Sequence, residues 1–317
     1  MSLISFEKAV EILKSLDKIA ILCHTNPDGD TLGCAFALMR ALKKTGKSVK
    51  VMCNGEIPKK FSYLYQNLEA DNFQPENYVA VDVADSKLLG DEFSEKYADK
   101  VILAIDHHGS NREFAQNTFV DSSAAAACEI IYRVILALGV EIDVETANAI
   151  YTGLSTDTGC FKYTNTTPAT HRIAAEIMEL GADFGMINKV MFETRTRSYV
   201  ALEKLAMNSM KMFFDDRCAI ITVTQDMYRQ SGSDESEIDA ICAIPRQIEG
   251  VDIGVTVKEK SENRYKISVR TNEPYDASQI CAKLGGGGHP RAAGCEILGS
   301  LDTVYDKLLE CIEEFTQ

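Results

Sequence analysis

The fold of this chain is decided by residues 18–30, which read KIAILCHTNPDGD. An apolar, β-branched run of strand length passes here directly into a loop that carries His24, Asp28 and Asp30. Further runs of strand length follow at residues 48–53, 78–83 and 100–105. Helical patterns lie between and after them, at residues 32–44, 124–138, 144–154 and 168–180. Strands that alternate with helices predict an α/β fold, in which a mostly parallel sheet has helices on both faces.

The alternation of strand and helix patterns ends at about residue 184. A charged run before residue 211 predicts a connecting helix, and two hairpin-like pairs of strands follow it together with further helical patterns. We therefore expect three parts: a larger domain at residues 1–190, a linker helix at residues 191–211, and a smaller α+β domain at residues 212–317.

The composition narrows the class of function. The 317 residues include 33 Lys and Arg against 47 Asp and Glu, which gives a net charge of −14 at pH 7. A strongly acidic protein gains little from counterion release on a long polynucleotide, so we do not expect it to bind long duplex nucleic acid. The sequence shows no signal-peptide core, no stretch apolar enough to cross a membrane, and no C-x-x-C motif among its ten cysteines. These features predict a cytoplasmic protein with reduced thiols and no membrane partner.

Acidic and imidazole side chains gather where the predicted strands end. The run at residues 78–83 contains Asp82 at its end, and the run at residues 100–105 leads into Asp106, His107 and His108. A Gly- and Thr-rich turn after a helical pattern carries Asp157. Because the carboxyl ends of parallel strands meet at one edge of a sheet, we expect these side chains to converge there with the loop at residues 24–30.

Each of these pieces has an ordinary structural explanation when it is taken alone. The sequence NPDG is typical of a β-turn, an Asp at a strand end often caps the next helix, and a His pair often lies in a solvated loop. Five aspartates in one crevice, however, would repel one another unless cations neutralised them. Carboxylates mixed with imidazoles suit Mn²⁺, Zn²⁺, Fe²⁺ or Co²⁺. A pair of such ions predicts phosphoryl chemistry, because they activate a water and stabilise the charge of the phosphoryl group.

A second feature is the sequence GGGGHPRAAG at residues 285–294. Consecutive glycines let backbone N–H groups approach an anion, and neighbouring side chains add donors. The loop matches neither a Walker A motif nor the usual dinucleotide fingerprint, and a flexible linker is the alternative interpretation. We expect it to bind the anionic part of a substrate through Gly285, Gly286, Gly287, Gly288, His289 and Arg291, with Arg270 at the end of a nearby predicted strand.

Five ordered motifs carry a resemblance to a known family. HTNPDGD, VDVAD, IDHHGSN and STDTG resemble the four motifs of the DHH phosphoesterases, and GGGGHPRAAG resembles the glycine-rich motif of the DHH-associated domain. The resemblance covers most of the chain, from about residue 18 to residue 297. Within the family, the size and the pairing of the two domains resemble the nanoRNases, which are bifunctional oligoribonucleases and pAp (3′-phosphoadenosine 5′-phosphate) phosphatases.

The resemblance implies a role for each matching residue. One metal ion would be held by His24, Asp28 and Asp82, and a second by Asp30, Asp82, His107 and Asp157. Asp106 would orient the site, and His108 would contact the scissile phosphate or protonate the leaving oxygen. The glycine-rich loop, with His289, Arg291 and Arg270, would hold another phosphate of the substrate. The two divalent ions that the family usually implies are Mn²⁺.

We therefore expect a manganese-dependent phosphohydrolase that cleaves short oligoribonucleotides to mononucleotides and removes phosphate from pAp. Two other substrates stay open within the same class, namely linear dinucleotides derived from cyclic-di-AMP and short-chain polyphosphate. An alternative of another class is a nucleotide-binding module without catalysis. The sequence leaves the oligomeric state undecided and is compatible with a homodimer.

Overall fold

The computed structural model describes residues 2–68 and 72–316 of the chain. It divides into two compact units, Met1–Thr194 and Arg195–Gln317. Helix α8 (Arg197–Asn208) occupies most of the segment expected as a linker, and it packs into the core of the second unit through Tyr199 and Leu202. None of the described helices is both long and apolar enough to span a bilayer.

The first unit is built on a six-stranded sheet whose neighbouring strands are all parallel. Its strand order is β1-β6-β5-β4-β2-β3. The strands are β1 (Ser2–Leu3), β2 (Ile19–Leu22), β3 (Val49–Met52), β4 (Asn77–Val81), β5 (Val101–Asp106) and β6 (Asn117–Val120). The four strands expected from the sequence are the four at the centre and at one edge, and the short strands β1 and β6 complete the sheet.

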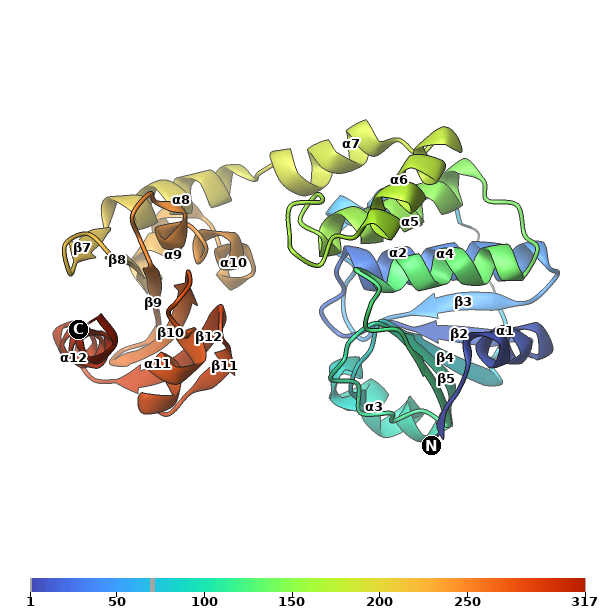
Figure 1. Cartoon of the computed structure of the whole chain (residues 1–317), viewed down its shortest axis with the longest axis horizontal. Coiled ribbons are helices and arrows are strands. Elements are labelled where there is room, and N and C mark those ends of the chain that lie inside the picture. Colours follow the sequence, from blue (N-terminus) through green and yellow to red (C-terminus); the bar gives the residue numbers. More distant parts are fainter. Residues whose placement is uncertain (1, 69–71, 317) are drawn as a thin grey trace. The chain divides into compact units, whose positions relative to one another are not determined.

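Both faces of this sheet are covered, which confirms the predicted α/β architecture. In β2, Ile19 and Ile21 pack under α1, α2 and α4, whereas Ala20 and Leu22 face the opposite side, towards α3 (Figure 1). This alternation follows from the two-residue period of a strand whose two faces are both buried. The helices of this unit are α1 (Phe6–Ser15), α2 (Gly29–Lys44), α3 (Asp91–Tyr97), α4 (Ala127–Ala137), α5 (Val144–Asp157), α6 (Pro168–Glu179) and α7 (Phe184–Asn188).

The second unit contains a mixed six-stranded sheet with the order β11-β12-β10-β9-β8-β7. Only β8 and β9 pair in parallel among these strands, and the two expected hairpins are β7–β8 and β9–β10. The strands are β7 (Lys211–Phe213), β8 (Cys218–Val223), β9 (Ile253–Ser261), β10 (Arg264–Thr271), β11 (Gly287–His289) and β12 (Ala292–Leu298).

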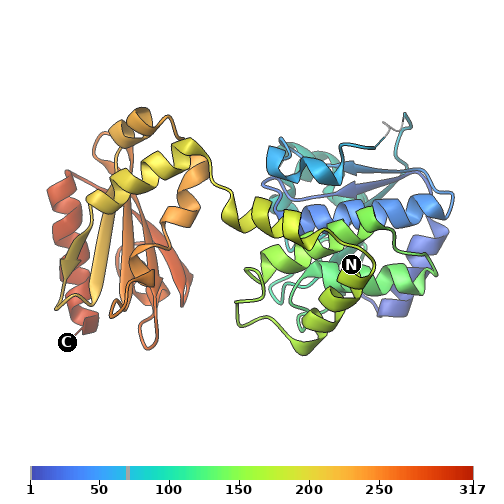
Figure 2. The same ribbon diagram turned by 90° about the horizontal axis from the view of Figure 1, so that it is seen from above.

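Helices cover this second sheet on both sides. In β8, Cys218 and Ile220 belong to the core formed with α11 and α12, whereas Ile221 and Val223 face α8, α9 and α10. Figure 2 shows α12, in red, running alongside the strands. The helices that follow α8 are α9 (Gln225–Ser231), α10 (Ile238–Ile241), α11 (Ala277–Lys283) and α12 (Leu301–Thr316). The predicted smaller α+β domain is therefore confirmed.

Candidate metal centre

The polar residues singled out in the first unit converge at the carboxyl edge of its sheet. His24 follows β2, Asp82 follows β4, and Asp106 ends β5. Two helices complete the site: α2 begins there with Asp28 and Asp30, and α5 ends there with Asp157. The structure thus brings together the side chains that the sequence analysis expected to meet.

Asp28 and Asp30 are fixed by the amino-terminal ends of two helices. Asp28 caps α2, since its Oδ1 accepts hydrogen bonds from the backbone N–H of Asp30 at 3.0 Å and of Thr31 at 3.1 Å. The carboxylate of Asp30 accepts hydrogen bonds from the backbone N–H of Ala127 at 2.6 Å and of Cys128 at 2.9 Å, at the start of α4. Helix amino-termini stabilise negative charge, so both carboxylates are held in place without a cationic side chain.

Close packing of α5 against α2 supports the position of Asp30. A Cβ atom at Gly153 would lie 2.5 Å from Oδ1 of Asp30 and 2.2 Å from Sγ of Cys128. A Cβ atom at Gly33 would lie 2.4 Å from the carbonyl oxygen of Ala149. Glycine is therefore required at both positions for the helices to approach this closely.

Ligand-type atoms gather around Nε2 of His24 and around Nε2 of His107, and Asp82 lies beside both nitrogens. In the first group, Nε2 of His24 lies 3.6 Å from Oδ1 of Asp28 and 4.0 Å from Oδ2 of Asp82. In the second, Nε2 of His107 lies 3.6 Å from Oδ1 of Asp82. The same nitrogen lies 3.9 Å from Oδ2 of Asp30 and 3.6 Å from Oδ2 of Asp157. These separations are too long for hydrogen bonds but suit atoms that share an ion, because ligands about 2.1 Å from a metal lie about 3–4 Å apart.

Two buried atoms at the centre of the site have no hydrogen-bond partner among the described residues: Oδ1 of Asp82 and Nε2 of His107. Nδ1 of His107 lies 3.2 Å from the carbonyl oxygen of Ala124, an arrangement in which Nδ1 donates and leaves the Nε2 lone pair facing the carboxylates. Asp82 also has a left-handed backbone, with φ at 57°, a conformation that costs free energy for a residue other than glycine. Unpartnered buried polar atoms are costly, and a metal ion is the partner that fits an imidazole nitrogen and carboxylate oxygens together.

The charges of the site call for cations. Burial, with the charge of Asp28, raises the pKa of Asp30 to about 6. Burial, with the charge of Asp30, raises the pKa of Asp157 to about 7. The pKa of Asp82 is raised well above its ordinary value by burial and by the surrounding aspartates, since only 4% of this residue is exposed. Divalent ions would remove this repulsion and keep the carboxylates charged.

Asp106 lies beside this cluster and holds His108. Its Oδ1 accepts hydrogen bonds from the backbone N–H of His107 and from Nδ1 of His108, both at 2.8 Å, and its Oδ2 accepts one from Nδ2 of Asn111 at 2.6 Å. Burial raises the pKa of Asp106, but the hydrogen bonds from His108 and Asn111 outweigh it and leave the pKa lowered. The hydrogen bond to Asp106 raises the pKa of His108. The His108 side chain is 46% exposed, so its other nitrogen can reach a substrate.

The glycine-rich loop of the second unit leads from the end of α11 into β11. The N–H groups of Gly285 and Gly286 donate to the carbonyl oxygens of Ala282 and Cys281, and thereby close the end of α11. These two N–H groups are used for a helix C-cap in the structure, and a role of Gly285 and Gly286 in substrate binding stays a prediction. Gly287 and Gly288 lie in the exposed strand β11 with His289.

Of the basic side chains near this loop, Arg270 and His289 lie on strands of the same sheet and Arg291 lies in the turn between β11 and β12. Arg270 pairs with Ala292, which in turn pairs with His289, so the three residues form one row across β10, β12 and β11. Nη1 of Arg291 donates to the carbonyl oxygen of Tyr275 at 2.6 Å, and the guanidinium lies 3.6 Å from Glu273. Arg291 is exposed, and its guanidinium group has further N–H donors besides the one that contacts the Tyr275 carbonyl oxygen.

Sequence reasoning missed three contributors to the metal centre: Asn111, Gly153 and the paired N–H groups at the start of α4. Asn111 stood within the motif IDHHGSN but was given no role. A glycine inside a helical pattern was the available signal for Gly153, because it lowers helix stability and so points to close packing. The α4 donors carry no side-chain signal, since they belong to the backbone.

Comparisons with known proteins agree with this architecture. The family model described as "DHH family, N-terminal domain" matches residues 18–154, and the DHHA1 domain matches residues 216–317. The chain is 33% identical over 313 residues to the bifunctional oligoribonuclease and PAP phosphatase NrnA of Thermus thermophilus, covering 96% of this chain and 92% of that relative. It is 25% identical over 293 residues to NrnA of Bacillus subtilis, covering 91% and 92%.

A solved structure has the same fold over nearly its whole length. The exopolyphosphatase-related protein of Bacteroides fragilis superposes with a TM-score of 0.86 at 25% identity, covering 98% of this chain and 96% of that one. Both domain models, the relative above 30% identity and the order of the motifs agree. The chain therefore belongs to the DHH family of phosphoesterases, with the family's N-terminal domain followed by a DHHA1 domain.

Proposed function

We propose that this protein hydrolyses phosphoester bonds in short oligoribonucleotides and in pAp, with two Mn²⁺ ions in the first unit. The observation that carries the proposal is the buried carboxylate of Asp82, which lies beside both His24 and His107 and whose Oδ1 has no hydrogen-bond partner among the described residues. The names of the relatives support the substrates, since those from Thermus thermophilus and Bacillus subtilis are called bifunctional oligoribonucleases and PAP phosphatases.

We assign the metal ligands by the two groups of atoms. His24, Asp28 and Asp82 would hold one ion, and Asp30, His107 and Asp157 would hold the other together with Asp82. Mn²⁺ suits this mixture of carboxylates and imidazoles better than Mg²⁺ or Ca²⁺, which prefer oxygen ligands alone. When bound, such ions supply Lewis acidity and lower the pKa of a water near the phosphorus atom.

The chain's own residues would control the proton of the leaving group. Asp106 orients His108, keeps its Nδ1 engaged and favours the protonated ring. The exposed Nε2 of His108 would donate a proton to the departing oxygen or hold the scissile phosphate. Asp106 is a positioning residue in this scheme, because its contacts go to His107, His108 and Asn111.

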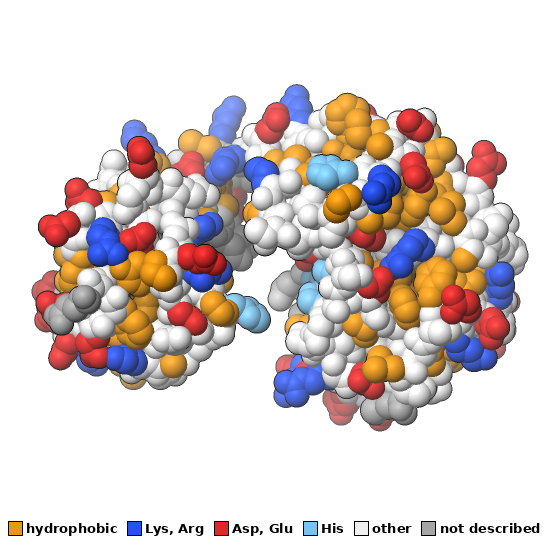
Figure 3. All heavy atoms as spheres, viewed as in Figure 1, with side chains coloured by type: hydrophobic (Ala, Val, Ile, Leu, Met, Phe, Trp, Pro, Cys, Tyr) orange, Lys and Arg blue, Asp and Glu red, His pale blue; other side chains and the backbone are white. Residues whose placement is uncertain are grey.

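We infer that the second unit binds a further phosphate of the substrate. Gly287, Gly288 and His289 lie in an exposed strand. Arg270 stands in one row with His289 across the sheet, and Arg291 directly precedes Ala292, the residue between them in that row. Basic side chains are interspersed with acidic ones on the face shown in Figure 3, rather than gathered in a broad basic surface. This pattern supports short substrates over long ones, because long nucleic acids are bound chiefly through many phosphate contacts.

A single experiment tests the proposal: turnover with and without Mn²⁺ on a diribonucleotide, a 24-nucleotide RNA, pAp and polyphosphate. We expect fast, Mn²⁺-dependent cleavage of the dinucleotide and pAp and slow cleavage of the long RNA. Activity confined to polyphosphate would favour a second candidate function, that of a short-chain exopolyphosphatase. The support for this candidate is that the Bacteroides fragilis protein with the same fold is called exopolyphosphatase-related. Nucleotide binding without turnover on any substrate would contradict the proposal and favour a binding module.

The cellular setting is part of the proposal. All ten cysteines are free thiols, and eight of them are buried. Free thiols in this number are typical of the reducing cytoplasm, where we place the protein. A homodimer stays a prediction that analytical ultracentrifugation of the full chain would test.

A further inference from the structure

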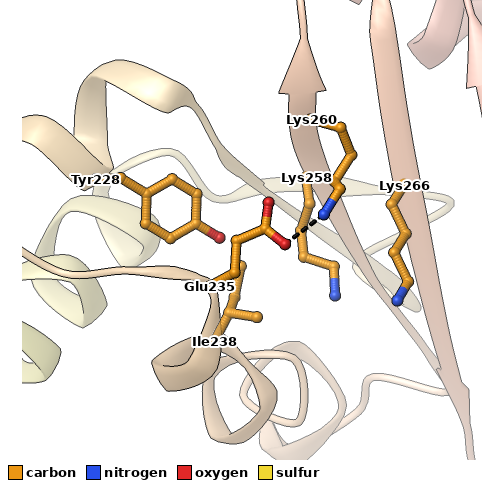
Figure 4. A pocket seen from close by; sticks show the side chains of 6 residues that line it. All are labelled: Tyr228, Glu235, Ile238, Lys258, Lys260 and Lys266. Atoms are coloured by element: carbon orange, nitrogen blue, oxygen red, sulfur yellow. Dashed lines mark hydrogen bonds and ion pairs between the residues drawn. The ribbon is translucent and has the colours of Figure 1, made fainter. Parts of the chain in front are cut away.

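A small pocket in the second unit is lined by three lysines that the proposed chemistry does not use. Its volume is about 180 Å³, and it lies between β9, β10 and the segment that contains α9 and α10. Figure 4 shows its lining residues, which are Tyr228, Glu235, Ile238, Lys258, Lys260 and Lys266.

Two of the lysines are placed against each other by the strand register. Lys258 on β9 pairs directly with Lys266 on β10, so their side chains leave the same face of the sheet. Their amines extend side by side into the pocket (Figure 4). Like charges directly opposite each other on adjacent strands are destabilising, and the fold therefore carries a cost at this position.

Among the side chains that the structure describes, none supplies the usual compensation for such a pair. Glu235 forms an ion pair with Lys260, and Glu296, which neighbours Lys266 on β12, pairs with Arg264 at 2.9 Å. Across residues 2–68 and 72–316, no described carboxylate lies within 4.0 Å of the amines of Lys258 and Lys266. Lys258 is nevertheless only 6% exposed. Most of the Lys258 side chain is therefore buried, and its ammonium group opens into the pocket beside that of Lys266 (Figure 4).

A protective role for these lysines at a sheet edge does not explain them. Charged residues, especially Lys, often keep edge strands from pairing with other chains. Both β9 and β10 lie inside the sheet, with a hydrogen-bonded strand on each side. The arrangement is therefore better explained by an anion that enters the pocket.

We propose that this pocket binds a phosphate monoester dianion, with Lys258 and Lys266 as its principal ligands. The three lysines and Glu235 leave the pocket with a net charge of +2, which complements the charge of about −2 on a phosphate monoester near neutral pH. A volume of about 180 Å³ equals about six waters, enough for a phosphate group. It is below the ~300 Å³ at which ordinary small-molecule pockets begin, so a sugar or base would stay outside.

The pocket shares no residue with the metal centre, since all of its lining residues belong to the second unit. It also uses none of the residues assigned to the glycine-rich loop. A phosphate ligand has two sources, free phosphate and the phosphate group of a mononucleotide. The chemistry of recognition is the same for both, and the experiment below separates them.

Isothermal titration calorimetry in EDTA tests the proposal, with inorganic phosphate, AMP and adenosine as the three probes. The full chain carries Arg291→Gln throughout, which weakens any contribution from the glycine-rich loop. We expect phosphate and AMP to bind and adenosine not to bind. Tighter binding of AMP than of phosphate would identify a mononucleotide as the ligand, and equal binding would identify the phosphate group alone.

Lys258→Met and Lys266→Met should each weaken phosphate binding by about tenfold or more, because each removes a charge-assisted contact. The control is Lys204→Met, at an exposed position of α8 in the same unit, which should leave the dissociation constant unchanged. An unchanged dissociation constant in both pocket variants, or binding of adenosine, would overturn the proposal.

Thermal unfolding of Lys258→Met provides a second readout. Without ligand, this variant should unfold at a higher temperature than its parent, because the repulsion between Lys258 and Lys266 has been removed and an apolar side chain of similar length has taken its place. A lower unfolding temperature would show that Lys258 is stabilised by the protein itself and would also overturn the proposal. These measurements use no metal and no turnover, so their failure is distinguishable from a failure of the proposed hydrolase function.

Discussion

Nδ1 of His108 lies 2.8 Å from Oδ1 of Asp106, a carboxylate that has no solvent exposure. This hydrogen bond fixes the orientation of the ring and leaves Nε2 as the nitrogen that can meet a substrate. Asp106 is itself held by Asn111, so a chain of three side chains ends at one exposed nitrogen. His108 also belongs to a group of possible metal ligands with Asp82 and His107, since its Nδ1 lies 3.6 Å from Oδ1 of Asp82, so its proposed role as a proton donor needs a direct test.

The first prediction concerns that proton. His108→Gln should lower kcat on a diribonucleotide by about 10²- to 10⁴-fold, as expected when a general acid is removed. On a p-nitrophenyl nucleotide ester the loss should be small, because that leaving group departs without a proton. Equal losses on the two substrates would mean that His108 contacts the phosphate and does not protonate the leaving oxygen.

The second prediction concerns metal content. The unaltered chain should bind two Mn²⁺ ions, and Asp28→Ala and Asp157→Ala should each bind about one, because each change removes a ligand from a different group. Asp82→Ala should lose both ions and all turnover, since Asp82 belongs to both groups. Atomic absorption after dialysis measures the content. Two ions retained in Asp157→Ala would exclude that residue as a ligand.

The third prediction is the pH dependence of stability without metal. The pKa values of Asp30 and Asp157 are raised to about 6 and about 7, so the folded protein binds more protons than the unfolded chain above pH ~4. Stability must then fall as pH rises through this window. In EDTA, the melting temperature should be lower at pH 8 than at pH 5.5.

Two comparisons check the cause of that trend. Asp157→Asn should flatten the dependence, because it removes a titrating group, and saturating Mn²⁺ should raise the melting temperature most at pH 8, where the ligands are deprotonated. The lowered pKa values of Asp28 and Asp106 act only at lower pH and do not interfere. An EDTA-treated protein that is more stable at pH 8 would contradict the description of the acidic cluster.

The fourth prediction separates two adjacent glycines of the substrate loop. A Cβ atom at Gly287 would meet nothing within 4 Å, so Gly287→Val should leave the melting temperature unchanged and chiefly raise KM. Gly288 has φ at 148°, and its Cβ would lie 2.6 Å from Cα of Ala293, so Gly288→Val should destabilise the fold. A lowered kcat with an unchanged KM in Gly287→Val would argue against a role in substrate binding.

The fifth prediction tests the packing behind Asp30. Gly153→Ala should destabilise the protein by about 1–3 kcal/mol and weaken Mn²⁺ binding, because the added methyl group collides with Asp30 and Cys128. Gly185→Ala on α7 is the matched control: its Cβ has only an ordinary contact at 3.8 Å, so stability should stay equal or rise slightly. Chemical denaturation measures both. Unchanged metal affinity in a folded Gly153→Ala protein would show that Asp30 adjusts freely.

Much of the fold was predictable because its signals are local. The apolar run at residues 18–23 forms β2 (Ile19–Leu22). All four residues of this strand are buried, as expected for a strand that is covered on both faces. The strand β1 was missed because two residues are too few to show a period, and β6 was missed because its sequence NTFV lacks the continuous apolar run that marked β2. β11 was missed for another reason, since a strand made of Gly287, Gly288 and His289 has no β-propensity to detect.

The site shows the same division between local and distant causes. The position of Asp82 follows from the end of one strand, but its left-handed backbone does not follow from any residue preference. Asp30 depends on N–H groups of residues 97 and 98 positions away in the sequence, and no periodicity reveals such a contact. At Gly285 and Gly286 the motif suggested an anion site but did not reveal that their N–H groups close the end of α11.

Each unit keeps its own apolar interior: the described clusters around the first sheet and around the second share no residue. The proposed bond-breaking residues all belong to the first unit, and the proposed contacts to a further phosphate of the substrate all belong to the second. Mutation can therefore alter what is recognised without disturbing how bonds are broken. A lineage built on this plan can exchange its second half and acquire new substrates while its reaction stays the same.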